Sequence, residues 1–225
     1  CWPIFNWGNE EQKKKYLPDL LSGKKLGAFG LTEPNAGTDA SGQQTRAELV
    51  GDKWILNGAK VFITNGGYAD VFVVMAMTDK SKGNHGISAF IVEKNDPGFS
   101  IGKTEDKMGI CASSTTELIF QNCEIPADRL LGQVGDGFKV AMSTLDGGRI
   151  GIASQALGIA QGAFDVTVEY MNARKQFGKK LSQMQALQFA MADLKTKIEA
   201  SRLLIYKAAD MKDKHMNYGE AAAMA

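Results

Sequence analysis

Hydrophobic positions between residues 25 and 131 occur in short runs that are rich in β-branched and aromatic side chains. Turn-forming sequences such as Asn65-Gly-Gly67 and Asn95-Asp-Pro-Gly98 separate these runs, and such residues favour the reversals between strands. Regular strand spacing without intervening helices predicts a compact antiparallel barrel or sandwich. The predicted strands are residues 27–31, 54–56, 60–64, 71–77, 87–92 and 117–120.

Beyond Gly135 the period of the hydrophobic positions becomes helical. Apolar residues from Phe138 onward recur at the i, i+3, i+4, i+7 spacing of one helix face, and a second such stripe begins at Leu187. The charged corner Arg174-Lys-Gln-Phe-Gly178 lies between the two stripes. The expected fold class is therefore α+β, with an all-β middle domain followed by part of an α-helical up-down bundle.

Residues 1–25 are predicted to be helical, with a capped start near Asn9 and a stop at Gly23. Since so short a segment cannot form a core, we interpret it as the end of an N-terminal helical domain. The expected domains are thus residues 1–25, a middle β domain at 26–134 and half of a helical bundle at 135–225. The chain opens on Cys1 and ends in helix-forming residues without a stop signal, so we expect a longer polypeptide.

Composition narrows the class of protein. The 225 residues are 44% hydrophobic and 23% charged, which is typical of a globular protein. A net charge of +1 provides no basic field for nucleic acid, and no apolar run is long enough to cross a membrane. The start does not resemble a signal peptide, because Lys13-Lys-Lys15 follows the apolar residues there.

Cysteine and histidine usage indicates neither a disulfide scaffold nor a zinc site. Cys1, Cys111 and Cys123 are an odd number without a CxxC motif, and His85 and His215 stand alone. A reducing compartment fits this usage best. We interpret the two later cysteines as small strand residues, His85 as a turn residue and His215 as a solvated residue at a helix end.

The segment Leu31-Thr-Glu-Pro-Asn-Ala-Gly-Thr-Asp39 combines hydroxyls, carboxylates and a glycine directly after a predicted strand. Pro34 removes one backbone donor and keeps Glu33 out of helical space, so the strand end turns into a loop. Such a loop can present several backbone N–H groups and two hydroxyls to one polar ligand. On the local sequence alone, an ordinary turn that closes a strand is the simpler interpretation.

Seven motifs carry a family resemblance that covers essentially the whole chain. They are Leu31-Thr-Glu-Pro with Gly37-Thr-Asp39, Asn57-Gly-x-Lys60-x-Phe-Ile-Thr-Asn65, Lys107-Met-Gly109, Pro126 with Leu131-Gly132, Gly137-Phe138, Leu145-Asp-Gly-Gly-Arg149 and Arg174-x-x-Phe-Gly178. In this order and at these spacings the chain resembles the flavin-dependent acyl-CoA dehydrogenases. Residues 31–39 and 77–86 are most similar to the short-chain (butyryl-CoA) dehydrogenases of anaerobic bacteria.

The resemblance implies a subunit with an N-terminal helical domain, a middle β domain and a C-terminal four-helix bundle. It also implies FAD as cofactor, an acyl-CoA substrate, a homotetramer built as a dimer of dimers, and electron-transfer flavoprotein as oxidant. The implied reaction removes the pro-R α proton and transfers a β hydride to the flavin, giving a trans-2-enoyl-CoA. Such an enzyme is expected in the bacterial cytoplasm, or in the mitochondrial matrix of a eukaryote.

The resemblance assigns a set of cofactor contacts. Residues 29–38 match the contacts to the flavin ring and ribityl chain, where fixed donors suit an anionic reduced ring. Phe62 stands where many relatives have Trp, and Thr64 matches a position near flavin N5 or O4. The implied cofactor-binding residues are Phe29, Leu31, Thr32, Gly37, Thr38, Phe62, Ile63, Thr64, Arg174, Gln176, Phe177, Met184 and Gln185.

Two further groups of residues face the FAD diphosphate and the substrate in the family. Arg174 and Gln176 match a corner that reaches the diphosphate of a neighbouring subunit, and a guanidinium can bind two of its oxygens at once. Without such a neighbour, Arg174 is a solvated cation at a helix end. The implied substrate-binding residues are Thr38, where relatives usually have Ser, together with Ser113, Leu145, Asp146 and Arg149. Asp146 and Arg149 also have the helical spacing to pair with each other.

No catalytic residue is assigned within the chain. The reaction needs a carboxylate that takes the α proton from the face opposite the flavin. Some family members place this Glu immediately before the arginine of the 145–149 motif, where this chain has Gly148. Others use a Tyr-Glu-Gly-Thr segment near the C-terminus, which does not occur here, so the base is expected beyond Ala225. Glu33 and Asp39 are not assigned as bases, because the family uses their loop for binding.

Other interpretations stay open at this stage. The chain alone is not expected to turn over, and a truncated or split paralogue would bind acyl-CoA or FAD without chemistry. An acyl-CoA oxidase, which passes electrons to oxygen, is a related enzyme alternative. Rapid reoxidation of the substrate-reduced flavin by air would indicate the oxidase.

Overall fold

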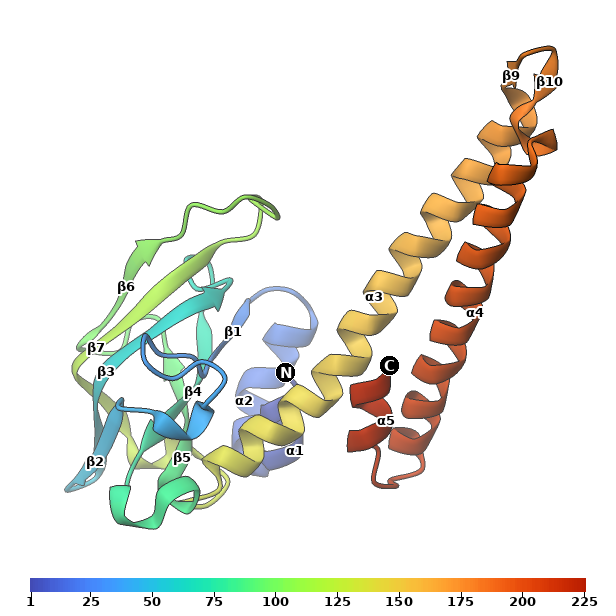
Figure 1. The fold of residues 1–225 in the computed structure, drawn as a ribbon. Coiled ribbons are helices and arrows are strands. Elements are labelled where there is room, and N and C mark those ends of the chain that lie inside the picture. The colour runs from blue at the N-terminus through green and yellow to red at the C-terminus, as the bar shows by residue number, and fades with distance from the viewer. The chain divides into compact units, whose positions relative to one another are not determined.

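The computed structural model describes all 225 residues and divides into two units, Cys1–Met142 and Ser143–Ala225 (Figure 1). The first unit contains the sheet together with the N-terminal helices. The second contains most of a long helix, a small hairpin and a second long helix.

Eight strands of the first unit form one sheet. Hydrogen-bonded neighbours follow the order β6-β7-β3-β2-β4-β5-β8, and β1 pairs with β4 beside this path. The strands are β1 (Gly27–Gly30), β2 (Arg46–Val50), β3 (Lys53–Thr64), β4 (Val71–Met77), β5 (Ile87–Glu93), β6 (Phe99–Thr104), β7 (Thr115–Pro126) and β8 (Leu130–Leu131). Three short 3-10 helices join them: η1 (Ala40–Gly42), η2 (Lys80–Gly86), which contains His85, and η3 (Ala127–Arg129).

The predicted fold class is confirmed, but the sheet is mixed and does not close into a barrel. β1 pairs with β4 in parallel, and so does β2 through Arg46 and Met77. The chain inserts the β2–β3 hairpin between β1 and β4, so that β4 returns beside β1 in the same direction. Strand spacing alone cannot reveal such a pairing, because it does not say which runs are neighbours.

Two predicted strands, at 54–56 and 60–64, form the single strand β3. A register shift against β7 occurs at Gly58, whose φ is +145°. A Cβ on Gly58 would lie 2.7 Å from the Cα of Thr45, so this bulge depends on glycine. The bulge allows the strand to continue where a break was expected.

The core of the first unit lies on both faces of the sheet. In β4, Phe72 and Val74 belong to one buried cluster, whereas Val73 and Met75 belong to the other. This two-sided burial explains the continuous apolar run in the sequence. The second cluster includes Ile4 from α1 (Trp2–Trp7) and residues of α2 (Glu10–Leu21), which cover that face.

Helix α2 begins as predicted, with a capping box in which the side chains and backbone amides of Asn9 and Gln12 bond reciprocally. Gly23 follows the helix with φ at +76°, the left-handed conformation that ends many helices. Gln12 also donates to the carbonyls of Asp128 and Leu130 at 2.7 and 2.9 Å. This buried side chain thereby fixes α2 to the segment around η3.

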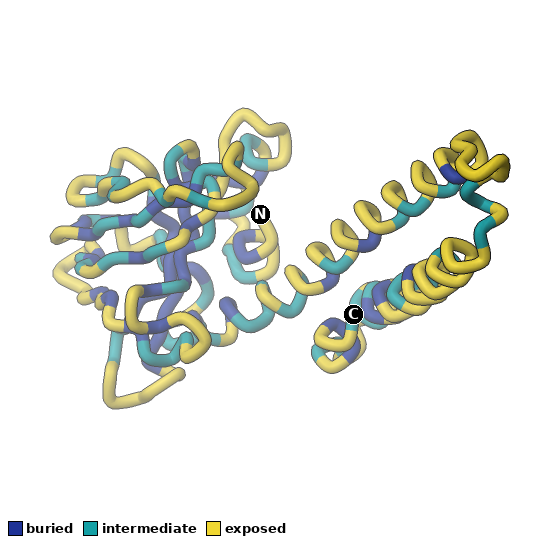
Figure 2. The backbone as a smooth tube through the Cα atoms, turned by 45° about the horizontal axis from the view of Figure 1, so that its top comes forward, coloured by how far each residue is buried: buried dark blue, intermediate teal, exposed yellow.

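The second unit is a pair of long helices. Helix α3 (Gly137–Ala173) leads into the hairpin β9 (Lys175–Gln176) and β10 (Lys179–Lys180), then η4 (Leu181–Gln183), α4 (Gln185–Asp213) and α5 (Gly219–Met224). Its core includes Leu157, Ile198 and Ile205. Large apolar side chains such as Ile159 and Leu203 remain exposed, and exposed positions run along both helices in Figure 2. This exposure is consistent with the predicted half of a bundle. None of the helices is long and apolar enough to cross a bilayer.

Candidate functional site

Three segments that the sequence singled out meet at one end of β3. The amide of Val61 donates to the carbonyl of Thr32 at 2.9 Å, which attaches the 31–39 turn to the strand. Thr64, at the end of β3, lies opposite Thr115 of β7. The amide of Asn65 donates to Ser114 at 2.8 Å, so the segment containing Ser113 reaches the same place.

Phe62 is presented to solvent by a second irregularity in β3. The register against β7 shifts between Lys60 and Ile63, and Phe62 has φ at +58° with 64% of its surface exposed. A non-glycine residue seldom adopts this backbone conformation. Because the ring is exposed, packing in the core does not explain why an aromatic residue stands here. The ring of Phe62 is therefore accessible to a ligand, as the predicted contact with one flavin face would require.

The polar groups of this surface are free to bind a ligand. The hydroxyls of Thr32, Thr38 and Thr64 make no hydrogen bond within the chain. Thr38 and Thr64 are exposed, and Thr32 is half-buried. Gly37 has open space where a Cβ would stand. An aromatic face with hydroxyl and amide donors at its edge fits the chemistry of a flavin ring. The residues present therefore fit FAD.

Other predicted contacts have their side chains in the core. Ile63 and Leu31 are buried in the two clusters, and Phe29 packs against the second. Ile63 and Leu31 can therefore offer a ligand mainly their backbone groups, whereas the side chain of Phe29 is only half-buried. Sequence motifs mark such positions but do not tell whether the side chain or the backbone is used.

A buried ion pair lies beneath the turn, and sequence reasoning did not identify it. The Lys60 ammonium donates to Glu33 at 2.7 Å, to Gln43 at 2.9 Å and to the carbonyl of Leu31 at 3.1 Å. Lys60 is fully buried and Glu33 is 4% exposed. The signal was available, because Lys60 has the same parity in β3 as the buried Trp54 and Leu56.

Burial and the attraction between the two charges act in opposite directions on the pKa values of this pair. Desolvation by burial lowers the pKa of Lys60 to about 8, although the Glu33 carboxylate acts to raise it. Burial acts to raise the pKa of Glu33, but Lys60 and the amide of Gln44 outweigh it and hold that pKa below its usual value. Glu33 is thus bound to a cation and to backbone amides, in agreement with its exclusion as a general base.

In the second unit, the predicted FAD contacts, which include Arg174 and Gln176 for the diphosphate, lie on and around the β9–β10 hairpin. Arg174 directly precedes β9, Gln176 lies in it, and Phe177 occupies the turn with φ at +53° and 93% exposure. Met184 is the N-cap of α4 and Gln185 its first residue. Several exposed cations surround the exposed ring, an arrangement that suits an anionic partner.

The predicted substrate residues of this unit lie far from the hairpin. Leu145, Asp146 and Arg149 are on α3, where Asp146 and Arg149 form a salt bridge. At 1.5 Å per helical residue, Asp146 lies roughly 40 Å along the helix from Arg174. The alternative of mutual pairing is therefore realised, and no single small site in this unit contains both groups.

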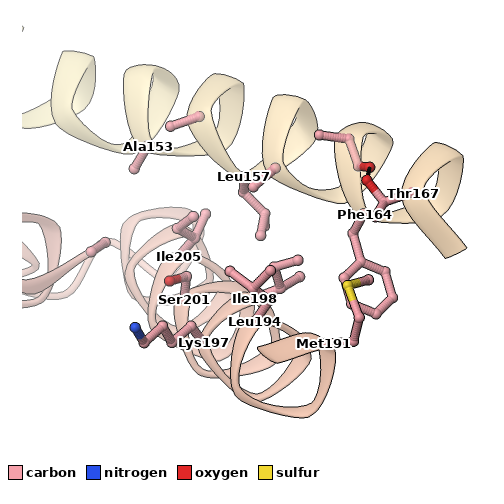
Figure 3. A pocket seen from close by; sticks show the side chains of 14 residues that line it. Ala153, Leu157, Phe164, Thr167, Met191, Leu194, Lys197, Ile198, Ser201 and Ile205 are labelled. Carbon is pink, nitrogen blue, oxygen red and sulfur yellow. Dashed lines mark hydrogen bonds between the residues drawn. The ribbon is translucent and has the colours of Figure 1, made fainter. Parts of the chain in front are cut away.

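A groove of about 450 Å³ also lies between α3 and α4 (Figure 3). Leu157 and Phe164 of α3 face Met191, Leu194 and Ile198 of α4 across it. The lining is almost entirely apolar and includes none of the predicted site residues. The groove offers packing surface but no convergent polar groups for chemistry.

Comparison with known families gives consistent matches along the chain. Residues 1–24 match the family model "Acyl-CoA dehydrogenase, N-terminal domain", residues 28–123 the middle domain and residues 135–225 the C-terminal domain. The "Acyl-CoA dehydrogenase, short-chain specific" of Megasphaera elsdenii is 59% identical over 99% of the chain. The chain spans 58% of the length of that relative.

Solved structures agree with these matches. The butyryl-CoA dehydrogenase from Megasphaera elsdenii has a TM-score of 0.95 and 59% identity, covering 99% of this chain and 58% of the other. A second similar chain has a TM-score of 0.96 and 63% identity, with coverages of 99% and 59%. It belongs to a structure described as the electron transferring flavoprotein of Acidaminococcus fermentans, in work on flavin-based electron bifurcation.

Proposed function

We propose, from the premise that this chain belongs to the acyl-CoA dehydrogenase family, that the protein converts a short-chain acyl-CoA to a trans-2-enoyl-CoA with FAD as cofactor. The observation that carries the proposal is the surface where residues 31–38, 62–64 and 113 meet. Its free hydroxyls and exposed Phe62 have the chemistry that the family resemblance requires. The identity to short-chain relatives supports a butyryl-CoA-like substrate.

The residues of the first unit would hold and orient the cofactor. FAD, when bound, supplies the acceptor for the hydride that leaves the substrate β carbon. The hydroxyls of Thr32, Thr38 and Thr64 and the neighbouring amides would donate to the ring edge, where charge develops on reduction. Phe62 would cover one face of the ring and keep water from it.

The substrate is held by a second set of groups. Thr38 and Ser113 of the first unit and Leu145, Asp146 and Arg149 of α3 would contact the acyl-CoA. A glutamate outside residues 1–225 would take the α proton, since Gly148 stands where some relatives carry the base. Arg174 and Gln176 would bind the FAD diphosphate of a neighbouring copy, and Phe177, Met184 and Gln185 would make further contacts with FAD.

The partners follow from the same proposal. A similar chain in a structure described as an electron transferring flavoprotein supports that flavoprotein as the oxidant. The roughly 40 Å between Asp146 and Arg174 is compatible with an oligomer in which copies share sites, and the family resemblance favours a homotetramer. A reducing compartment, the bacterial cytoplasm or the mitochondrial matrix, suits its three free cysteines.

The test uses the purified full-length protein with FAD in the absence of oxygen. Butyryl-CoA is expected to bleach the visible absorption band of the bound flavin. Arg149→Gln should weaken the apparent affinity for butyryl-CoA by about tenfold, because a charged hydrogen bond is lost. Arg46→Gln, at an exposed pair with Glu48, is the matched control and should leave the affinity unchanged.

Two results would contradict the proposal. The first is that the purified protein retains no FAD. The second is that the bound FAD stays oxidised after addition of straight-chain acyl-CoA esters of every length. Bleaching followed by fast recovery in air would replace the dehydrogenase with an oxidase.

A further inference from the structure

We propose that Lys60, with Glu33 and Gln43, is the positioning centre of the flavin site. The inference rests on the proposed function, because it concerns how the chain holds the groups that would contact FAD. Lys60 itself would touch neither cofactor nor substrate. Its buried ammonium fixes the 31–38 turn against the end of β3 that carries Phe62 and Thr64.

The geometry of the ammonium is complete. Its three acceptors, the Glu33 carboxylate, the Gln43 amide oxygen and the Leu31 carbonyl, lie at 2.7 to 3.1 Å. An ammonium has three donors, so each one is used. The group is fully buried, so the loss of one partner would leave a donor without a hydrogen bond and away from bulk water. The cluster therefore has one hydrogen-bonded arrangement.

Glu33 extends this arrangement to the backbone. Its carboxylate accepts from the amide of Gln44 at 2.6 Å and from that of Thr45 at 3.1 Å, at the start of β2. Gln43 donates to the carbonyl of Ala40 in η1 at 2.9 Å. The cluster thus joins β3, the 31–38 turn, η1 and the approach to β2, which are the segments on either side of the free threonine hydroxyls.

Lys60 also stands directly before the irregular part of β3. The register against β7 shifts between Lys60 and Ile63, and Phe62 lies within that shift at positive φ. The amide of Val61 holds the carbonyl of Thr32. The ammonium of Lys60 and the amide of Val61 therefore both bind the 31–38 turn, and Phe62 is the next residue in the strand.

Stability alone does not account for a buried charged pair. Desolvation of two ions is costly, and well-packed apolar residues of similar volume are often as stable or more so. A fixed polar cluster specifies one arrangement of the segments it joins. Here those segments carry the donors whose spacing must match a flat, rigid ring.

The test measures FAD binding and the flavin reduction potential in the full-length protein with Lys60→Met, Glu33→Gln and Lys53→Met. Lys60→Met keeps the length of the side chain and removes the ammonium. Lys53→Met makes the same change on the same strand, at the exposed pair with Glu124. Glu33→Gln keeps the size of the side chain and weakens the same cluster, so it decides the matter if Lys60→Met does not fold.

The expected result is a loss of FAD affinity of about tenfold in Lys60→Met, as for other changes behind a binding site, and a smaller loss in Glu33→Gln. The reduction potential should fall in both, because misplaced donors stabilise the reduced ring less well. Amide hydrogen exchange of residues 31–38 in the FAD-free protein should become faster. Lys53→Met should match the unaltered protein in all three measurements. A merely structural role would lower the melting temperature without moving the potential.

The outcomes separate the inference from the proposed function. If the unaltered protein and Lys53→Met bind FAD, and folded Lys60→Met and Glu33→Gln bind it with the same affinity and potential, the inference is overturned and the function stands. If even the unaltered protein does not bind FAD, the proposed function fails and the inference fails with it.

Discussion

At the scale of single residues, two buried threonines of the first unit differ in one respect. Thr45 donates its hydroxyl to the carbonyl of Ala59 at 3.2 Å, whereas the hydroxyl of Thr116 has no hydrogen-bond partner. Both side chains are almost completely buried. Desolvating a hydroxyl without replacing its hydrogen bonds is unfavourable, so the two residues should respond oppositely to the same substitution.

Thr116→Val should stabilise the protein by about 1 kcal/mol, because it removes an unsatisfied hydroxyl at nearly constant volume. Thr45→Val should destabilise it by about 1–2 kcal/mol, because the Ala59 carbonyl loses its donor. Chemical denaturation of both variants measures the two free energies of unfolding. Equal effects in the two variants would show that the hydrogen-bond difference has no energetic weight.

Residue identity indicates which polar groups a segment carries more directly than it indicates which side chains are buried. The motifs pointed to hydroxyls at Thr32, Thr38 and Thr64, and these hydroxyls are free in the structure. They did not reveal that Ile63 is a core residue, because a contact through the backbone and a contact through the side chain leave the same motif. Lys60 was overlooked since a lysine in a strand is usually solvent-exposed.

At the scale of elements, Gln12 joins a helix to the rest of the first unit. It completes the capping box with Asn9 and donates to the carbonyls of Asp128 and Leu130. Gln12→Ala should lower the free energy of unfolding by about 2 kcal/mol, through the lost cap and the unsatisfied carbonyls. Denaturation monitored by circular dichroism measures this loss.

The neighbouring residue supplies the control. Lys13 pairs only with Glu10 at the helix surface, so Lys13→Ala should change the stability by less than about 0.5 kcal/mol. If Gln12→Ala were equally mild, the attachment of α2 through this side chain would be wrong.

The elements themselves were largely predictable, because hydrophobic period and turn chemistry are local. The runs at 71–77 and 87–92 became β4 and β5, and the capped helix began after Asn9. The bulge at Gly58 and the parallel pairing of β1 with β4 depend on contacts between distant segments. The pattern of hydrophobic and polar residues along the chain does not show which distant segments are in contact, so it could not predict these two features.

At the scale of the whole molecule, the distance along α3 allows a test of whether copies share sites, as proposed above. If Asp146 and Arg149 serve the site of one copy and Arg174 that of another, two differently inactivated variants should complement each other. Arg149→Gln and Arg174→Gln should each have low activity, whereas the co-expressed pair should exceed the sum. A mixed assembly retains a site with both arginines intact.

Activity of the mixture equal to the sum of the separate variants would mean that each copy uses its own Arg174. Two copies of Arg149→Gln carrying different affinity tags serve as the control. Their co-purified assembly should show no gain, since every site in it lacks the same group.

The most direct measurement is the mass of the thioester product after butyryl-CoA, FAD and electron-transfer flavoprotein are incubated with the full-length protein without oxygen. The expected product has lost two hydrogen atoms and gained none, and it forms only when FAD and the flavoprotein are both present. An unchanged thioester, or turnover that needs oxygen in place of the flavoprotein, would contradict it.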